Sequence, residues 1–352
     1  MSLSRSLLNL TALPLKLGRR HRPRRSPLNP RILIIRRNRL GDMIYTLPLL
    51  YALRRHYAQS HLAVACDPAG APIAEACPAV NEVIVLERGV NPWAAMVTNA
   101  ARLQDFDWVV AAKGGFDRRL ATLTRLTNGA IRVGFTRRAD RPSSCYTDPV
   151  ALPDDPHEEH QIDTLFRLLR PLGLLNPSKF TTDLSLRLPQ SSRDFAAALL
   201  AQPAFFRFML INLSSTVPLK FREEDFAALA TRILAATDLT VGLVAAPADQ
   251  PKARELAARM ASERVVAVAT PGPLDLAALL EHAAFLITPE GGAAHLAATV
   301  DTPALVLWSE GPFKKWHSRG IGHAFVHPEP GERILPVERV WQALQPFLVP
   351  KT

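Results

Sequence analysis

Short apolar runs alternate with stretches of helical periodicity over most of the chain from residue 31 onward. The first run, residues 32–35, is rich in β-branched side chains and apolar on both faces, as a buried parallel strand is. Such alternation predicts a mostly parallel sheet with helices on both faces. In this first part we expect strands at 32–35, 62–65, 83–86, 108–111 and 131–134, and helices after Asp42, Pro72, Pro92 and Arg118.

Residues 146–190 interrupt this alternation with clusters of proline and acid around an expected helix at 160–172. Gly173 and the pair Asn176-Pro177 form a helix-stop signal after it. A second alternating series then begins, so we expect the chain to build the same α/β architecture twice, with a cleft between. Its strands are expected at 208–213, 241–245, 265–268, 285–288 and 304–308, and its helices at 223–237, 250–262, 274–282 and 293–299.

The length of 352 residues also favours two domains, because it is about twice the usual domain size. We expect a basic tail at 1–29, an N-terminal domain at 30–175 and a C-terminal domain at 176–352. The C-terminal helix is expected to pack back on the N-terminal domain.

The net charge of +10 is concentrated in the tail, which holds seven basic residues and no acid. Leucines precede its arginine cluster, a combination that suits the surface of an anionic membrane. A disordered basic leader without a role is the alternative. No aromatic residue interleaves with the arginines, which argues against nucleic acid, and the apolar part is neither a spanning helix nor a signal peptide.

Cys66, Cys77 and Cys145 have no paired or metal-like spacing. We expect reduced, structural thiols in a cytoplasmic protein. No metal site and no cofactor are expected.

Asp42 lies where the first expected strand gives way to an amphipathic helix. Ligands of open α/β sheets bind at the carboxyl ends of the strands, so this carboxylate is a candidate for a chemical role. The alternative is a cap of the following helix.

Three loops of the second series also lie at strand ends, where a nucleotide would bind. Two glycines after a strand open a helix whose amides suit a phosphate, but taken alone this pattern is more typical of a plain tight turn. Hydroxyls and a lysine suit a pyrophosphate, or form a capping cluster with a solvated lysine. Asp249 either caps a helix or accepts bonds from a ribose. In chain order, the first loop contains Ser214, Ser215, Thr216 and Lys220, the second contains Asp249, and the third contains Glu290, Gly291, Gly292, Ala293 and His295.

Five motifs in order resemble those of glycosyltransferase family 9, the ADP-heptose:lipopolysaccharide heptosyltransferases. They are Gly-Asp-Met-Ile-Tyr-Thr-Leu-Pro at 41–48, Asp-Trp-Val-Val-Ala-Ala-Lys-Gly-Gly at 107–115, the linker helix at 160–173, the loop of Lys220, and Glu-Gly-Gly-Ala-Ala-His at 290–295. The first is most similar to the form in heptosyltransferase I enzymes. The resemblance spans residues 31 to about 345 and implies a GT-B fold, with the acceptor on the first Rossmann-like domain and the nucleotide sugar on the second.

By this resemblance Asp42 is the general base of an inverting, metal-independent transfer. Lys220, with Ser214, Ser215 and Thr216, would neutralise the departing diphosphate, and Asp249 would contact the ribose. The amides of Gly291, Gly292 and Ala293 would hold the same diphosphate, and His295 matches the histidine of the last motif, as a ligand contact or as a capping or core residue.

The resemblance implies heptose transfer from ADP-heptose to an acidic glycolipid of the Kdo-lipid A type, at the inner face of the cytoplasmic membrane. The expected acceptor contacts are Arg39, Gly41, Thr46, Lys113 and Arg118, with solvated surface charge as the alternative for the basic residues. One position departs from the family, which usually has Asp-Ser/Thr-Gly where this chain has Glu290-Gly291-Gly292.

The longer acid leaves other donor sugars open. Another nucleotide sugar in surface-glycan assembly, or a non-catalytic nucleotide- or glycan-binding relative, are therefore alternatives. An NAD-type dehydrogenase is disfavoured because no Gly-x-Gly-x-x-Gly follows a first strand.

Overall fold

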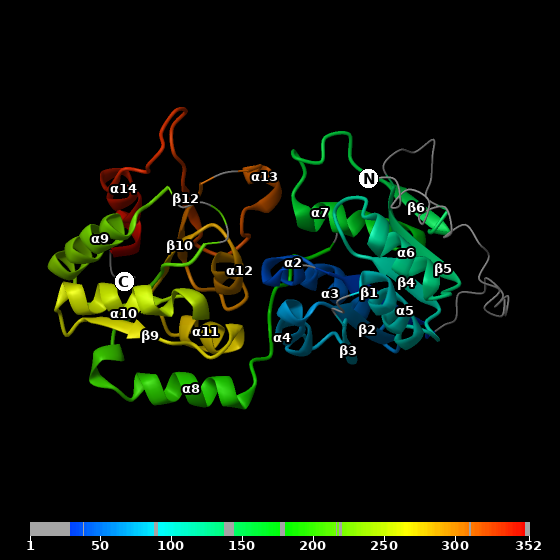
Figure 1. Ribbon diagram of the computed structural model, residues 1–352, viewed down its shortest axis with the longest axis horizontal. Helices are drawn as coiled ribbons and strands as arrows, with labels where there is room; N and C mark the ends of the chain where they lie inside the picture. The colour runs from blue at the N-terminus through cyan, green and yellow to red at the C-terminus, as the bar shows by residue number, and fades with distance from the viewer. Residues whose placement is uncertain are drawn as a thin grey trace.

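The chain folds into two α/β halves, each built on a six-stranded parallel sheet, in a computed structural model (Figure 1). This confirms the expected fold class. The structure describes residues 29–37, 39–87, 91–136, 144–176, 180–215, 217, 220–309 and 311–348. Thr216 and all but the last residue of the tail lie outside the described residues.

The first sheet has the strand order β3-β2-β1-β4-β5-β6, with every pair parallel. Its five expected strands are confirmed. The sixth, β6, was not expected because it is short and half exposed and contains Pro149, which a strand at the sheet edge tolerates. The strands are β1 (Arg31–Arg36), β2 (His61–Cys66), β3 (Glu82–Val85), β4 (Trp108–Ala111), β5 (Ile131–Thr136) and β6 (Asp148–Ala151).

The helix expected after Asp42 begins two residues before it, so that Asp42 lies inside the first turn of α2. A break at Tyr45 and Thr46 separates α2 from α3, and the linker helix changes into a 3-10 helix that contains Pro171. The helices of this half are α2 (Leu40–Ile44), α3 (Leu47–His56), α4 (Ala71–Glu75), α5 (Pro92–Arg102), α6 (Arg118–Leu126) and α7 (Gln161–Phe166), with 3-10 helices η2 (Pro68–Gly70) and η3 (Arg167–Leu172).

The second sheet has the order β12-β11-β10-β7-β8-β9, and five of its strands were expected. The strands are β7 (Phe208–Asn212), β8 (Thr240–Val244), β9 (Val265–Val268), β10 (Leu286–Pro289), β11 (Ala304–Leu307) and β12 (Ala324–Val326). The helices are α8 (Gln190–Leu200), α9 (Glu223–Ala236), α10 (Gln250–Met260), α11 (Pro273–Leu280), α12 (Gly292–Ala298), α13 (Phe313–Trp316) and α14 (Val337–Leu348), with η5 (Pro203–Phe205) and η6 (Pro247–Asp249).

Two features of the domain organisation differ from expectation. Helix α14 packs on α9, β11 and β12, where Val340 and Leu344 complete the apolar core of the second half, so the expected return to the first half is wrong. The linker beyond residue 176 stays on the first half, because Ser185 accepts a bond from Tyr51 (2.6 Å) and the Arg187 amide donates to Ala76 (2.8 Å). The chain enters the second half at α8, later than expected.

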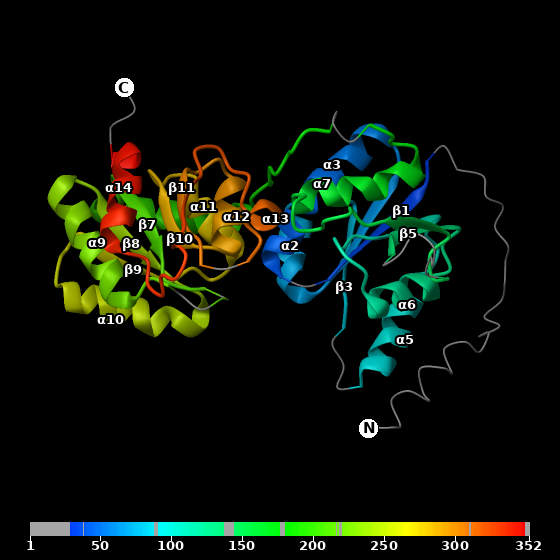
Figure 2. The same ribbon diagram turned by 90° about the horizontal axis from the view of Figure 1, so that it is seen from above.

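The two halves meet through short helices that both begin at the carboxyl ends of strands. Helix α2 of the first half packs on α12 of the second, and α4 packs on α11. Both views show α2 facing α12 and α13 across the middle of the molecule (Figures 1 and 2). A single buried apolar cluster runs through this seam. Among the described residues, every helix is too short or too polar to cross a bilayer.

Candidate active site

Asp42 lies at the seam, beyond the carboxyl end of β1, where its backbone belongs to the first turn of α2. Its Oδ2 accepts the backbone N–H of Arg39 (3.2 Å), and its Oδ1 accepts a hydrogen bond from the guanidinium of Arg36. The side chain keeps 18% of its surface exposed. Asp42 therefore stabilises the start of the helix and remains open to the solvent side of the seam.

The pairing of Arg36 with Asp42 was not expected, and Arg36 is the most buried charge of the site. It ends β1 with a 2% exposed side chain, and its guanidinium donates to the side chain of Asp42, to the Asp42 carbonyl (3.0 Å) and to the Ala112 carbonyl. Burial lowers the pKa of Arg36, and the neighbouring Asp42 opposes that shift. The sequence signal was an arginine at the last position of an apolar strand, six residues before the acid.

Tyr45 reaches across the seam from the end of α2 and was also missed. Its hydroxyl lies 3.0 Å from Nε2 of His295 on α12 and donates to the carbonyl of Trp316 at the end of α13. Burial raises the pKa of Tyr45 well above 10, and the charge of Asp42 adds to the shift, so the phenol is neutral. Burial lowers the pKa of His295 to about 3, so the imidazole is neutral as well.

The interface between α2 and α12 has little spare room. A Cβ atom on Gly41 would lie 2.8 Å from Cδ2 of His295, and one on Gly292 would lie 3.2 Å from Cδ2 of Leu40. Gly41 thus makes space for the imidazole. His295 also contacts Tyr45. It is therefore a buried residue that packs at the seam between the two halves.

Two of the expected donor residues are brought together at the strand ends of the second sheet. The Ser214 hydroxyl donates to Oδ2 of Asp249 (2.8 Å) and accepts the backbone N–H of Ala246 (2.8 Å). Asp249 also pairs with Lys252 (2.6 Å), and the hydrogen bonds from Lys252 and Ser214 lower the pKa of its carboxyl. Ser215 accepts the amide of Val217 (3.1 Å).

The other donor loop leads into α12. Gly291 has φ +141°, a backbone conformation that favours glycine, and no atom of the described residues lies within 4 Å of where its Cβ would be. The Glu290 carboxylate accepts the backbone N–H of Ser309 (3.0 Å) at the end of β11. Ala293 is half-buried in the first turn of α12. The backbone of the loop is therefore accessible at Gly291.

Lys220 follows β7 in a half-buried position. Its carbonyl accepts the amide of Leu335 (2.6 Å), which attaches this loop to the segment before α14.

The expected acceptor residues divide into two groups. Arg39 and Arg118 are exposed at the starts of α2 and α6, and Lys113 pairs with Asp117 (2.6 Å), which also caps α6. Thr46, in contrast, is wholly buried and donates to the Asp42 carbonyl (2.9 Å). The expected contact of Thr46 with an acceptor is wrong, because its hydroxyl is used to stabilise the turn that carries Asp42.

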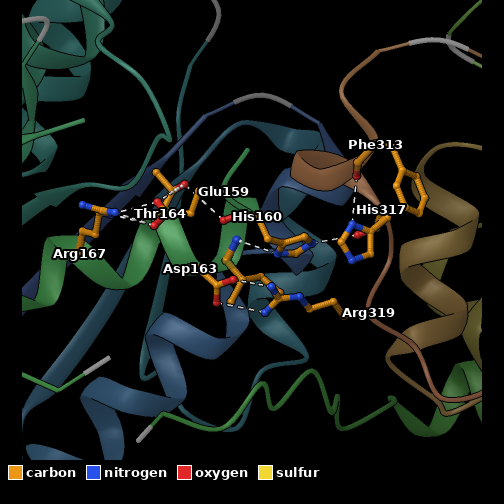
Figure 3. Close-up of polar contacts among 9 residues, drawn as sticks. Glu159, His160, Asp163, Thr164, Arg167, Phe313, His317 and Arg319 are labelled. Atoms are coloured by element: carbon orange, nitrogen blue, oxygen red, sulfur yellow. Dashed lines mark hydrogen bonds and ion pairs between the residues drawn. The ribbon is translucent and has the colours of Figure 1, made fainter. Parts of the chain in front are cut away.

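Polar contacts between α7 and the chain after α13 also join the halves (Figure 3). The His160 Nδ1 accepts the Ile162 amide (3.2 Å), so its Nε2–H donates to the carbonyl of His317 (2.9 Å). Burial lowers the pKa of His160 to about 4. Asp163 and Arg319 form a two-point ion pair, one of whose contacts is 3.1 Å long.

Cys66 and Cys77 are buried free thiols. Burial raises the pKa of Cys66 to about 12 and that of Cys77 to about 11, so these thiols are protonated. The described part of the chain holds no group of three or more His, Cys, Asp or Glu side chains arranged for a metal ion.

Two parallel α/β halves that meet at the carboxyl ends of their strands define the GT-B class of glycosyltransferase. The model of glycosyltransferase family 9 (heptosyltransferase) matches residues 97–323. The chain belongs to this family and is a glycosyltransferase. The matched range includes the donor loops and Lys113, whereas Asp42 precedes it.

Solved structures share the fold over nearly the whole chain. A glycosyl transferase family 9 protein from Veillonella parvula DSM 2008 is 19% identical (TM-score 0.77, covering 91% of this chain and 97% of that one). E. coli ADP-heptose lps heptosyltransferase II is 17% identical (TM-score 0.72, 90% and 98%), and E. coli heptosyltransferase WaaC with ADP is 21% identical (TM-score 0.72, 90% and 99%). No curated protein matches the chain by sequence.

Proposed function

We propose that this chain transfers heptose from ADP-heptose to an acidic glycolipid of the Kdo-lipid A type, in the assembly of the lipopolysaccharide inner core. The observation that carries the proposal is the packing of α2, with Asp42, directly against α12, which follows the glycine loop. This contact supports a role for Asp42 as an acceptor-side carboxylate that acts close to a donor-side loop. Solved family members named as ADP-heptose enzymes, one of them with ADP, support the choice of donor.

In the proposed reaction, Asp42 takes the proton of the acceptor hydroxyl as its oxygen attacks the anomeric carbon of the heptose. The bond from that carbon to the diphosphate breaks on the opposite side, so the configuration inverts and ADP leaves. Arg36 supports this role because it fixes one carboxylate oxygen of Asp42 and leaves the exposed part of the side chain for the acceptor.

The donor is assigned to the strand ends of the second sheet. Lys220, Ser214, Ser215 and Thr216 neutralise the diphosphate together with the amides of Gly291, Gly292 and Ala293, and Asp249 contacts the ribose. Protein groups thus supply the positive charge, and we propose that no metal is required. Glu290 of the same loop accepts the Ser309 amide, and we assign it to the sugar of the donor.

The acceptor is assigned to the first half. Arg39 and Arg118 are exposed, and Lys113 becomes available when an acceptor phosphate or carboxylate replaces Asp117. We propose that the enzyme works at the inner face of the cytoplasmic membrane, where its basic tail contacts anionic lipid.

A binding screen with ADP-, UDP-, GDP- and dTDP-sugars tests the donor assignment. A ligand that binds the folded state raises the unfolding midpoint, so ADP-heptose is expected to give the largest shift. A larger shift with another nucleotide sugar would favour the second candidate, a family 9 transferase of different donor, to which the longer side chain of Glu290 points. Transfer to a Kdo-lipid acceptor, followed by mass spectrometry, then tests the reaction itself.

A further inference from the structure

The Tyr45 hydroxyl is bonded at the same time to two separate elements of the opposite half. It contacts Nε2 of His295 on α12 at 3.0 Å and the backbone carbonyl of Trp316 at the end of α13. A carbonyl oxygen only accepts, so the single hydroxyl proton is donated to Trp316. The hydroxyl oxygen must then accept from His295, which assigns the imidazole proton to Nε2.

The environment of His295 favours a neutral imidazole, which carries one proton on the ring. The residue is buried among apolar and aromatic groups, and burial lowers its pKa to about 3, so the ring is neutral near pH 7. A neutral imidazole carries its proton on either nitrogen, and the bond to Tyr45 decides between the two.

Tyr45 and His295 each follow a group of the proposed reaction by three residues. Tyr45 comes three residues after Asp42 at the end of α2, and His295 comes three residues after Gly292 at the start of α12. Three residues are nearly one helical turn, so each residue lies on the same side of its helix as the group that precedes it. The Tyr45–His295 bond is therefore about one turn away from the base on one side and from the diphosphate loop on the other.

We propose that Tyr45 is a positioning residue for glycosyl transfer, whose hydroxyl joins α2, α12 and α13 and so sets the spacing between Asp42 and the donor loop. The inference rests on the proposed function, which supplies the roles of Asp42 and the loop. The tight fit of Gly41 against His295 makes this spacing sensitive to the bond, because a Cβ at Gly41 would already approach the ring to 2.8 Å.

Replacing Tyr45 with Phe isolates the contribution of the hydroxyl. The ring is held independently by contacts with His295 (4.5 Å between centroids), His160 (5.6 Å) and Trp316 (5.8 Å). Tyr57→Phe is the matched control, since its hydroxyl also donates to a backbone carbonyl, that of Leu172, but within the first half.

In Tyr45→Phe we expect kcat to fall about tenfold or more, because the variant loses both hydrogen bonds of the hydroxyl across the seam. The Kd of ADP, measured by calorimetry, should stay within about twofold of the wild-type value. Tyr57→Phe should leave both constants unchanged. In wild-type protein with 15N-labelled histidine, long-range 15N–1H spectra at pH 7 should show His295 protonated on Nε2, and Tyr45→Phe should mix the two tautomers.

A second pair of variants approaches the same bond from α12. His295→Gln keeps an N–H donor and should retain most of the turnover, whereas His295→Leu should lose as much as Tyr45→Phe. The double variant of Tyr45→Phe and His295→Leu should lose no more than either alone. If Tyr45→Phe does not fold, the two His295 variants test the importance of the bond without it.

An unchanged kcat in folded Tyr45→Phe, or a wild-type His295 protonated on Nδ1, would overturn the proposal. A loss that appears in the Kd of ADP instead of kcat would do the same, because it would place Tyr45 in donor binding. Failure of the proposed function has a different signature: wild-type protein would then transfer no sugar from ADP-heptose, while the tautomer still reports on the bond.

Discussion

Arg36 and Asp42 form a partly buried ion pair in which the last residue of β1 holds the first-turn carboxylate of α2. The guanidinium also bonds the carbonyls of Asp42 and Ala112, and so connects β1, α2 and the end of β4. The pair thereby fixes the position of the proposed base relative to the sheet.

Removing this arginine should destabilise the protein strongly. Arg36→Met leaves the Asp42 carboxylate and two carbonyls without their donor, and we expect the free energy of unfolding to fall by roughly 3–5 kcal/mol. Arg37→Met is the control, because Arg37 is 35% exposed and pairs more loosely with Asp67 at 3.4 Å. Its loss should stay below about 1 kcal/mol. Urea unfolding of both variants decides the point, and equal losses would contradict it.

The contact between Asp163 and Arg319 should hold the halves together without adding much stability. Both side chains are partly exposed, so Asp163→Asn should cost less than about 1 kcal/mol. We expect small-angle scattering of this variant to show a larger radius of gyration at moderate salt. Glu159→Gln is the control, because Glu159 pairs with Arg167 in the same half (2.7 Å) and should leave the radius unchanged. The account of this contact fails if both variants expand alike.

Buried neutral histidines should make the fold sensitive to acid. Burial lowers the pKa of His160 to about 4 and that of His295 to about 3, below the value of about 6.5 in the unfolded chain. The unfolded state therefore binds more protons, so stability is full above pH 6.5 and falls as the pH drops toward 4.

The expected slope is about 1.4 kcal/mol per pH unit for each such histidine. Urea unfolding between pH 7 and pH 5 measures it. His160→Gln should reduce the slope. A free energy of unfolding that stays constant over this range would refute the assignment.

Gln161 is a polar residue that the structure leaves unsatisfied. It is fully buried at the start of α7, and neither its Nε2 nor its Oε1 has a hydrogen-bond partner among the residues that the structure describes. Gln161→Met keeps the length of the side chain and removes the unpaired amide, so it should raise the free energy of unfolding by about 1 kcal/mol. Gln161→Ala serves as the comparison and should lower it, because a cavity remains. If Met destabilised as much as Ala, the amide would have to be satisfied in solution.

The sheet strands were predictable from the sequence because both of their faces are buried. Residues 32–35 and 208–213 therefore read as continuous apolar runs. Strand β6 was not predicted, because Pro149 and its exposed neighbours do not form a continuous apolar run. The C-terminal helix was expected, but its direction of packing depends on which apolar faces remain uncovered, a property of the assembled fold.

In the site, Asp42 was predictable because a polar residue between a buried strand and the body of the following helix lies at the ligand-binding edge of the sheet. Tyr45 was not, because its partners on α12 and α13 are 250 and 271 residues away in the chain. Thr46 was misjudged for a local reason: the break between α2 and α3 turns its hydroxyl inward to the Asp42 carbonyl.

The most direct test of the central claim is the turnover of Asp42→Asn with ADP-heptose and a Kdo-lipid acceptor. Asp67→Asn is the matched control, since Asp67 also follows a parallel strand, β2, and also contacts an arginine. We expect kcat of Asp42→Asn to fall by about 100-fold or more with the Kd of ADP nearly unchanged, while the control keeps its activity. Turnover of Asp42→Asn close to that of the wild type would contradict the claim that Asp42 is the base.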